Sequence, residues 1–220
     1  MHKIFRNVFD EIELIDFLRP KKEFISMTTG YKATDARIAK FVPFCPSTVS
    51  SDLKGKIVNK VQEALPHDGG YCFTESWSVQ KYYDYELGKF DWHKDRIETN
   101  FNLAFREEHT AEENYLRTLM PQREASISIA LNDRSEYEGG QFILDVGDGK
   151  RSAVDLDFGD MVIFDSDTLH GVEPVTKGMR NALIIWLTHK DKTIEWLEEV
   201  KDANCTKLVP TGLTELYDTL

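Results

Sequence analysis

The sequence has 220 residues, of which 41% are hydrophobic and 30% charged, as expected for a single globular domain (residues 1–220) with a substantial core. Its formal net charge is −11 and its basic residues are scattered, so a polyphosphate partner such as nucleic acid is disfavoured. The longest apolar run, residues 182–187, is too short to span a membrane. Three cysteines without a C-x-x-C motif indicate a reducing compartment, and we expect the cytoplasm.

The first seventy residues favour helices. Residues 7–18 repeat apolar side chains with a helical period, and Pro20 ends that pattern. Ser50 can cap a second helix over residues 51–65, whose apolar side chains share one face. We therefore expect residues 1–70 to form a helical support region for the rest of the chain.

The composition changes after residue 70. Between residues 76 and 189 the chain consists mostly of short strand-like runs divided by Gly, Asp and Asn, with a strong hairpin turn at residues 147–149. Short strands at this spacing are typical of an antiparallel sandwich or barrel. Residues 190–220 should add a helix over 191–200 and a tail. The predicted strands are 76–85, 89–93, 125–131, 141–146, 153–156, 160–164, 170–175 and 180–188.

One long segment, residues 96–122, does not fit the strand pattern. It is polar, and we expect it to be partly helical around residues 112–120. Loops of this length in compact domains are commonly lids or substrate-binding elements. Because its composition gives it little core to bury, we expect it to be mobile and to order over a substrate. The alternative is a solvated insertion without a role.

A possible metal site begins at His93 and Asp95. Their i, i+2 spacing puts both side chains on one face of a strand. His-x-Asp alone occurs often by chance, but His170 on a distant strand would add a second imidazole. Two imidazoles and one carboxylate cover one face of an octahedron and leave other positions open, as in non-haem Fe(II) oxygenases.

Arg180 follows His170 by ten residues, after a turn at residues 176–178. It shares strand parity with the apolar Ala182 and Ile184, so we expect it to point into the barrel together with His170. A guanidinium in an apolar interior is costly unless an anion meets it, and a carboxylate is the natural bidentate partner. That carboxylate belongs either to a ligand or to an Asp or Glu of the protein.

These motifs together resemble the 2-oxoglutarate/Fe(II)-dependent dioxygenases, and within them the prolyl 4-hydroxylase-like branch. The resemblance covers residues 76–189 and implies a mainly β chain with flanking helices, folded as a double-stranded β-helix (a jelly-roll or cupin-like barrel). It rests on the segments 85–88, 93–95, 128–132, 137–142, 158–160, 165–170 and 172–175, together with Arg180 and Trp186.

The resemblance also implies roles for individual residues. Two positions depart from the family pattern: Ala130 stands where an aromatic residue is frequent and Ser128 where apolar residues are common. By resemblance His93, Asp95 and His170 would hold the iron, Arg180 and Tyr85 would bind the distal carboxylate of 2-oxoglutarate, and Arg123 and Trp186 would face the co-substrate or substrate.

The implied reaction consumes 2-oxoglutarate and O2, with Fe(II) as cofactor and ascorbate as an optional reductant, and hydroxylates a C–H bond while releasing succinate and CO2. The first choice of substrate is a prolyl or other amino-acid side chain in a protein or peptide. A free amino acid or small metabolite is the alternative, and a non-enzymatic metal-binding cupin-type protein is an alternative of another class. Demethylation of nucleobases is disfavoured by the acidic charge and by Trp186, which stands where those enzymes tend to have a second arginine.

Overall fold

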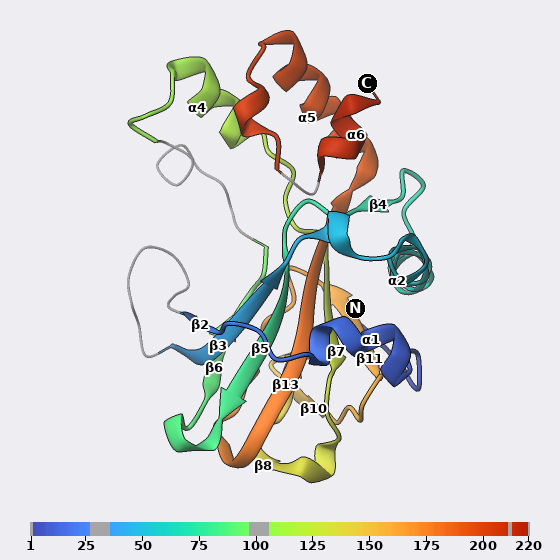
Figure 1. Ribbon diagram of the computed structural model, residues 1–220, viewed down its shortest axis with the longest axis vertical. Coiled ribbons are helices and arrows are strands. Elements are labelled where there is room, and N and C mark those ends of the chain that lie inside the picture. The colour runs from blue at the N-terminus through green and yellow to red at the C-terminus, as the bar shows by residue number, and fades with distance from the viewer. Residues whose placement is uncertain (1, 27–35, 97–105, 211–212, 220) are drawn as a thin grey trace. The chain divides into compact units, whose positions relative to one another are not determined.

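The structure is a computed structural model that describes residues 2–26, 36–96, 106–210 and 213–219 (Figure 1). The chain forms two compact units. The predicted core, residues 76–189, contributes most of its residues to unit 1. Unit 1 comprises Met1–Phe44, Trp77–Asp95 and Ser126–Ile185, and unit 2 comprises Cys45–Ser76, Arg96–Ala125 and Trp186–Leu220.

Unit 1 is built on an antiparallel sheet that curls into a double-stranded β-helix (Figure 1). Its strands follow the order β1-β11-β7-β13-β5-β3-β6-β12-β9-β10. Strand β3 bends the sheet, because residues 40–44 pair with β5 whereas Arg37 and Ile38 pair with β6. The strands are β1 (His2–Phe5), β2 (Phe24–Ser26), β3 (Arg37–Phe44), β5 (Trp77–Tyr83), β6 (Lys89–His93), β7 (Ala125–Ala130), β8 (Tyr137–Gly139), β9 (Phe142–Asp145), β10 (Arg151–Val154), β11 (Met161–Asp165), β12 (His170–Val172) and β13 (Val175–His189), with short 3₁₀ turns η2 (Asp84–Glu86) and η3 (Arg134–Glu136).

The two faces of the curled sheet are filled differently. The inner face holds an apolar cluster that includes Leu144, Val162 and Phe164. Helix α1 (Glu11–Leu18) covers part of the outer face, where the Phe17 ring lies 4.7 Å from that of Phe44 and 5.9 Å from that of Trp77. A polar side chain on the apolar inner face is expected to have a hydrogen-bond partner or to bind a ligand.

The Phe158-Gly159-Asp160 segment anchors the N-terminal strand. Gly159 has φ +77°, and a Cβ at this position would collide with the carbonyl oxygen of Phe9. The buried Asp160 carboxylate accepts hydrogen bonds from the backbone N–H of Asn7 (2.8 Å) and from Nη1 of Arg6 (2.6 Å). These contacts hold the chain that follows β1 against the turn that precedes β11.

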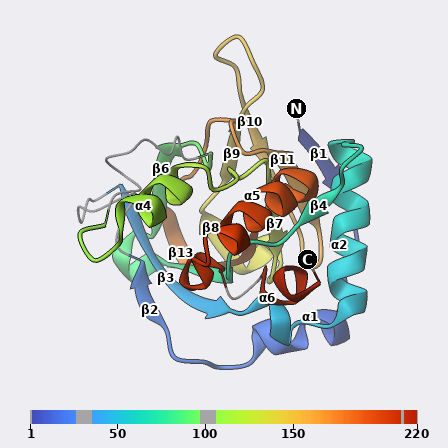
Figure 2. The ribbon, with the colours of Figure 1, turned by 90° about the horizontal axis from the view of Figure 1, so that it is seen from above.

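Unit 2 is mainly helical, and Figure 2 shows α4, α5 and α6 grouped together. Leu116 of α4 and Leu197 of α5 belong to one buried apolar cluster. The indole Nε1 of Trp196 donates to the carbonyl oxygen of Leu116 at 2.8 Å. The elements are η1 (Pro46–Thr48), α2 (Ser51–Ala64), β4 (Tyr71–Cys72), α4 (Ala111–Thr118), α5 (Lys190–Asp202), η4 (Thr206–Leu208) and α6 (Thr214–Asp218).

Two expectations about organisation are corrected. The N-terminal seventy residues are not only helical, because they also contain β1, β2 and β3. The segment 96–122 was expected to bury little core, which is wrong for α4, since Leu116 is 4% exposed within the cluster of unit 2. Residues 97–105 of this segment lie outside the described residues.

The predicted strands agree closely with the structure in the region that carries the motifs. Strand β6 has the predicted bounds, and β9 and β11 each differ from the prediction by one residue at both ends. The predicted strand 170–175 is observed as the shorter β12, and the turn predicted at residues 176–178 is wrong, because β13 already begins at Val175 and continues to His189. Within the described part of the chain, no helix combines the length and apolar character needed to cross a membrane.

Candidate active site

His93, Asp95 and His170 come together on the inner side of the curled sheet of unit 1. His93 is the last residue of β6, His170 is the first of β12, and the two are paired across these antiparallel strands. Nε2 of His93 lies 3.6 Å from Oδ1 of Asp95, and Nε2 of His170 lies 3.4 Å from Oδ2. The local pairing of two strands therefore brings together two histidines that are 77 positions apart in the sequence.

The backbone orients both imidazole rings. Nδ1 of His93 lies 2.8 Å from the carbonyl oxygen of Asp91, and Nδ1 of His170 lies 2.9 Å from that of Thr168. A carbonyl only accepts hydrogen bonds, so each Nδ1 carries the proton and donates it. Each Nε2 is then left with its lone pair, in the form that ligates a metal.

Burial supports this assignment for His170, whose exposed fraction is 4%. Desolvation lowers the pKa of His170 below its usual range, and the nearby Asp95 carboxylate acts in the opposite direction. The neutral imidazole is therefore the favoured form. Apolar rings line the site: Phe90 stacks on His93 at 3.5 Å between centroids, and Phe164 packs edge-on against His170 at 4.7 Å.

The three side chains fit a divalent metal ion. Their ligand atoms all lie within 4.8 Å of one another, and no other such group of His, Cys, Asp or Glu occurs among the described residues. Adjacent ligands of a metal bound at about 2.1 Å are separated by roughly 3 Å, so the two Nε2–carboxylate distances need to close by only about half an ångström. Two imidazoles and one carboxylate suit Fe(II) and leave coordination positions for other ligands.

Arg180 lies on β13, opposite Tyr82 of β5, whose ring belongs to the inner apolar cluster. The Arg180 side chain is buried (4% exposed), and its Cζ lies 5.4 Å from the centre of the Tyr82 ring. Its Nη1 has no hydrogen-bond partner, and no carboxylate in the described part of the chain forms an ion pair with it. A buried guanidinium without a carboxylate partner from the protein is suited to bind an anionic ligand.

Tyr85 is not brought to the inner face. Its side chain is 66% exposed, and its hydroxyl accepts a hydrogen bond from Nζ of Lys40 at 2.6 Å. The expected contact with the 2-oxoglutarate carboxylate is therefore not supported for Tyr85. Tyr82, which is 2% exposed, is the tyrosine that the structure pairs with Arg180. The sequence carries no signal for Tyr82, because β5 and β13 are far apart in the chain and only their pairing in the fold places this residue opposite Arg180.

Arg123 and Trp186, the two further predicted pocket residues, both belong to unit 2. The guanidinium of Arg123 stacks over the Trp186 ring at 3.8 Å and forms a bidentate ion pair with Glu75. The indole Nε1 of Trp186 is buried without a hydrogen-bond partner. The structure thus brings these two residues together, and Glu75 is a third member that the sequence did not indicate.

Comparisons with known proteins agree with the geometry. The family model of the 2OG-Fe(II) oxygenase superfamily matches residues 77–188, just over half of the chain. A PKHD-type hydroxylase of Xylella fastidiosa (strain 9a5c) is 34% identical over 105 residues, which are 43% of this chain and 45% of that protein. One of Colwellia psychrerythraea is 30% identical over 109 residues, 48% of this chain and 46% of that protein. The chain thus spans about half the length of the curated relatives it matches.

Solved structures share the fold at low identity. A prolyl hydroxylase from Trichoplax adhaerens, in complex with a peptide fragment of hypoxia inducible factor, has a TM-score of 0.59 at 15% identity, covering 87% of this chain and 85% of that one. A Pseudomonas putida prolyl-4-hydroxylase has a TM-score of 0.51 at 15% identity, covering 86% and 92%. With the double-stranded β-helix, the His93–Asp95–His170 cluster and the family match in agreement, this chain belongs to the 2OG-Fe(II) oxygenase superfamily.

Proposed function

We propose that this protein is an Fe(II)- and 2-oxoglutarate-dependent hydroxylase that acts on a C–H bond of a prolyl or other amino-acid side chain in a protein or peptide. The observation that carries the proposal is the convergence of two Nε2 atoms and one carboxylate at His93, Asp95 and His170. The family match supports the use of iron and 2-oxoglutarate.

His93, Asp95 and His170 would hold Fe(II) from one side. Their backbone partners keep both Nε2 lone pairs directed at the same point, so little reorganisation is needed when the metal binds. The backbone N–H of Asp95 donates to the carbonyl oxygen of Ser166 at 2.9 Å, which fixes the chain at the third ligand. Three protein ligands would leave other coordination positions of the metal for the co-substrate and O2.

Arg180 would bind the far carboxylate of 2-oxoglutarate. Its Nη1 lacks a partner, and a planar guanidinium suits two parallel hydrogen bonds to a carboxylate. Tyr82, opposite it on β5, would support the same carboxylate from the neighbouring strand. This pairing would hold the co-substrate in one orientation.

The bound iron would supply the oxidative decarboxylation of 2-oxoglutarate to succinate and CO2, coupled to hydroxylation of the substrate. The protein's own contribution is to exclude water and to orient the reactants. Phe142 and Phe164 lie near His170, with ring centroids 5.7 and 4.7 Å away, and form an apolar wall on that side. An apolar surrounding of this kind protects a reactive centre from water.

A protein or peptide is favoured as substrate by the peptide in the complex of the Trichoplax adhaerens prolyl hydroxylase, whose fold this chain shares. A free amino acid or small metabolite stays the alternative, because the fold is shared with SnoK, a carbocyclase from nogalamycin biosynthesis (TM-score 0.52). A reducing compartment, in keeping with the cytoplasm, is part of the proposal because Cys45, Cys72 and Cys205 are free thiols.

The proposal is tested by a screen over proline-containing peptides and free amino acids with Fe(II), 2-oxoglutarate and ascorbate in air. We expect succinate release together with a +16 mass shift on a peptide, and neither with the Asp95→Ala variant. A mass shift on free amino acids alone would move the assignment to the small-molecule alternative. A protein that binds metal but neither binds nor consumes 2-oxoglutarate would contradict the proposal and favour a cupin-type binding protein.

A further inference from the structure

We propose that unit 2 contains a second ligand site, which binds a small amphipathic anion such as an aliphatic or aromatic carboxylate. The site is a pocket of about 620 Å³ lined by residues of η1, α2, β4, the start of α5 and α6. Pockets that bind small molecules are typically about 300–1,000 Å³ in volume. All of its lining residues belong to unit 2, and none belongs to the His93–Asp95–His170 cluster.

The walls of this pocket are largely apolar. Tyr71, Phe73 and Leu213 line it and are 7%, 8% and 1% exposed. The Tyr71 hydroxyl donates to the carbonyl oxygen of Leu65 at 2.7 Å, so its polar end is satisfied and its ring is held in place. Leu216 of α6 adds a half-buried apolar side chain. These walls suit the hydrocarbon part of a ligand.

Two lysines supply positive charge to the same pocket. Lys54 comes from α2, and Lys190 is the first residue of α5, where the helix dipole adds a partial positive charge. Among the described residues, no carboxylate forms an ion pair with either lysine. Asp191, the acid next to Lys190, instead accepts from Nε2 of His67 at 3.2 Å.

Acidic residues outnumber basic ones in this chain, whose net charge is −11, so carboxylates are plentiful as partners for lysines such as Lys54 and Lys190. Elsewhere in unit 2, Lys60 lies 2.9 Å from Glu63 and Lys207 lies 2.7 Å from Glu113. Two lysines beside apolar walls complement a ligand with one anionic head group and an apolar body. A neutral apolar ligand would not use the two charges, and a highly hydrated sugar phosphate would not match the walls.

The probe for this site is 8-anilinonaphthalene-1-sulfonate, whose fluorescence reports binding, with decanoate and decanol as competitors. The full chain should bind the probe at one site, and decanoate should displace it whereas decanol should not. Lys54→Glu and Lys190→Glu should each weaken probe binding roughly tenfold or more, since each reverses a charge beside the head group. Lys54→Arg keeps the charge and should retain binding.

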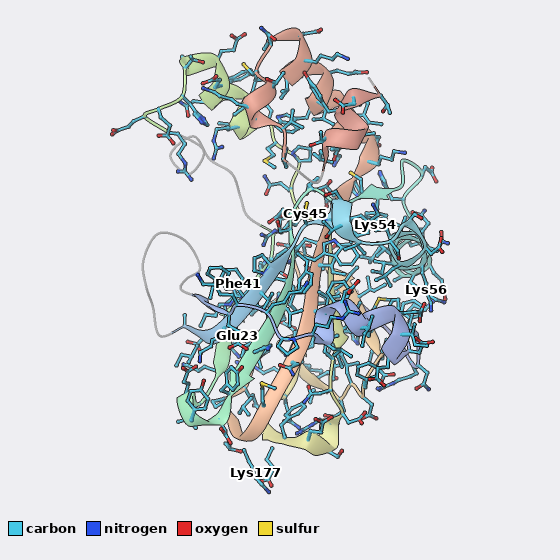
Figure 3. The ribbon with its side chains drawn as sticks, in the orientation of Figure 1. Glu23, Phe41, Cys45, Lys54, Lys56 and Lys177 are labelled. Atoms are coloured by element: carbon cyan, nitrogen blue, oxygen red, sulfur yellow. The ribbon has the colours of Figure 1, made fainter. Side chains whose placement is uncertain are left out.

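Lys56→Glu is the matched control. Lys56 is two residues from Lys54 on α2 but does not line the pocket, and the two lysines extend in different directions in Figure 3. Residues two apart do not share a helix face, so this variant makes the same charge change away from the pocket. Equal thermal midpoints establish that the variants are folded. The proposal is overturned if the wild type does not bind the probe, if both pocket variants bind it as the wild type does, or if Lys56→Glu weakens binding as much as they do.

Discussion

His93 and His170 face each other across β6 and β12, and each ring donates from Nδ1 to the carbonyl oxygen of the residue two positions before it. The same local arrangement is thus used twice, on strands that are far apart in the sequence. Because backbone atoms accept both hydrogen bonds, the orientation of the two rings depends on the backbone conformation just before each histidine.

Burial of His170 predicts that the stability of the metal-free protein depends on pH. Its folded pKa lies below the ordinary value of 6.5, chiefly because of desolvation, so between these two pKa values the unfolded chain binds more protons. The free energy of unfolding should therefore fall as the pH drops below about 6.5, and His170 should contribute nothing to the pH dependence above that pH. Urea unfolding at pH 7.5 and 5.5 measures this effect. The difference between the two pH values should shrink in His170→Gln, and an identical difference in both proteins would refute the assignment.

Arg180→Ala should lose affinity for 2-oxoglutarate while retaining the metal, because only the far carboxylate loses its partner. Leaving such a charge-assisted pair unmatched costs about 2–5 kcal/mol of binding free energy. Arg180→Lys should be intermediate, since a point charge replaces the planar fork. Calorimetry on Mn(II)-loaded protein provides the measurement.

Lys177→Ala is the control for Arg180, because Lys177 lies on the same strand but is exposed and pairs with Glu138 (Figure 3). It should bind 2-oxoglutarate like the wild type. Wild-type affinity in Arg180→Ala would assign Arg180 to a structural role and remove it from the co-substrate site.

Variants of Tyr82 and Tyr85 test which tyrosine binds 2-oxoglutarate. The structure favours Tyr82, and the sequence motif favours Tyr85. Tyr82→Phe should weaken 2-oxoglutarate binding by about 1 kcal/mol, the usual contribution of one hydrogen bond, because Tyr82 is buried opposite Arg180. Tyr85→Phe should leave binding unchanged, since its hydroxyl lies on the surface with Lys40. The reverse pattern in calorimetry would restore Tyr85 and exclude Tyr82.

Leu116→Ala should lower the free energy of unfolding by about 2–5 kcal/mol, because it removes a buried side chain from the core cluster of unit 2. Tyr115→Ala is the comparison on the same helix: Tyr115 is 59% exposed, and its loss should change stability little. Chemical denaturation of both variants tests whether α4 is part of a core. If Leu116→Ala unfolds at the wild-type denaturant concentration, the original expectation of a weakly packed lid is correct for this helix.

The sequence pattern was most informative where strand alternation and motif coincide. Alternation placed β6 and β13 and predicted that Arg180 points inward, which its burial beside Tyr82 confirms. It did not indicate β1, β2 and β3, because the sequences of these strands lack strict alternation. The motif match selected Tyr85 but does not report that this residue lies in the 3₁₀ turn η2, with its hydroxyl beside Lys40.

The orienting carbonyls of Asp91 and Thr168 also had no signal in the sequence. Every residue has a carbonyl group, so only the folded backbone shows which of them accepts a hydrogen bond. The sequence also did not predict that α4 packs into a core. Its sequence is mostly polar, and a single leucine on one turn carries the packing.

The most direct test of the metal centre is the iron content of the purified, Fe(II)-reconstituted protein, measured by elemental analysis together with 2-oxoglutarate-dependent succinate release. The wild type should hold one iron per chain, whereas His93→Ala and Asp95→Ala should lose the iron and succinate release together while staying folded. His67→Ala, a histidine of unit 2 outside the cluster, should keep both. Unchanged iron content in folded His93→Ala and Asp95→Ala would contradict the assignment of His93, Asp95 and His170 as the metal site.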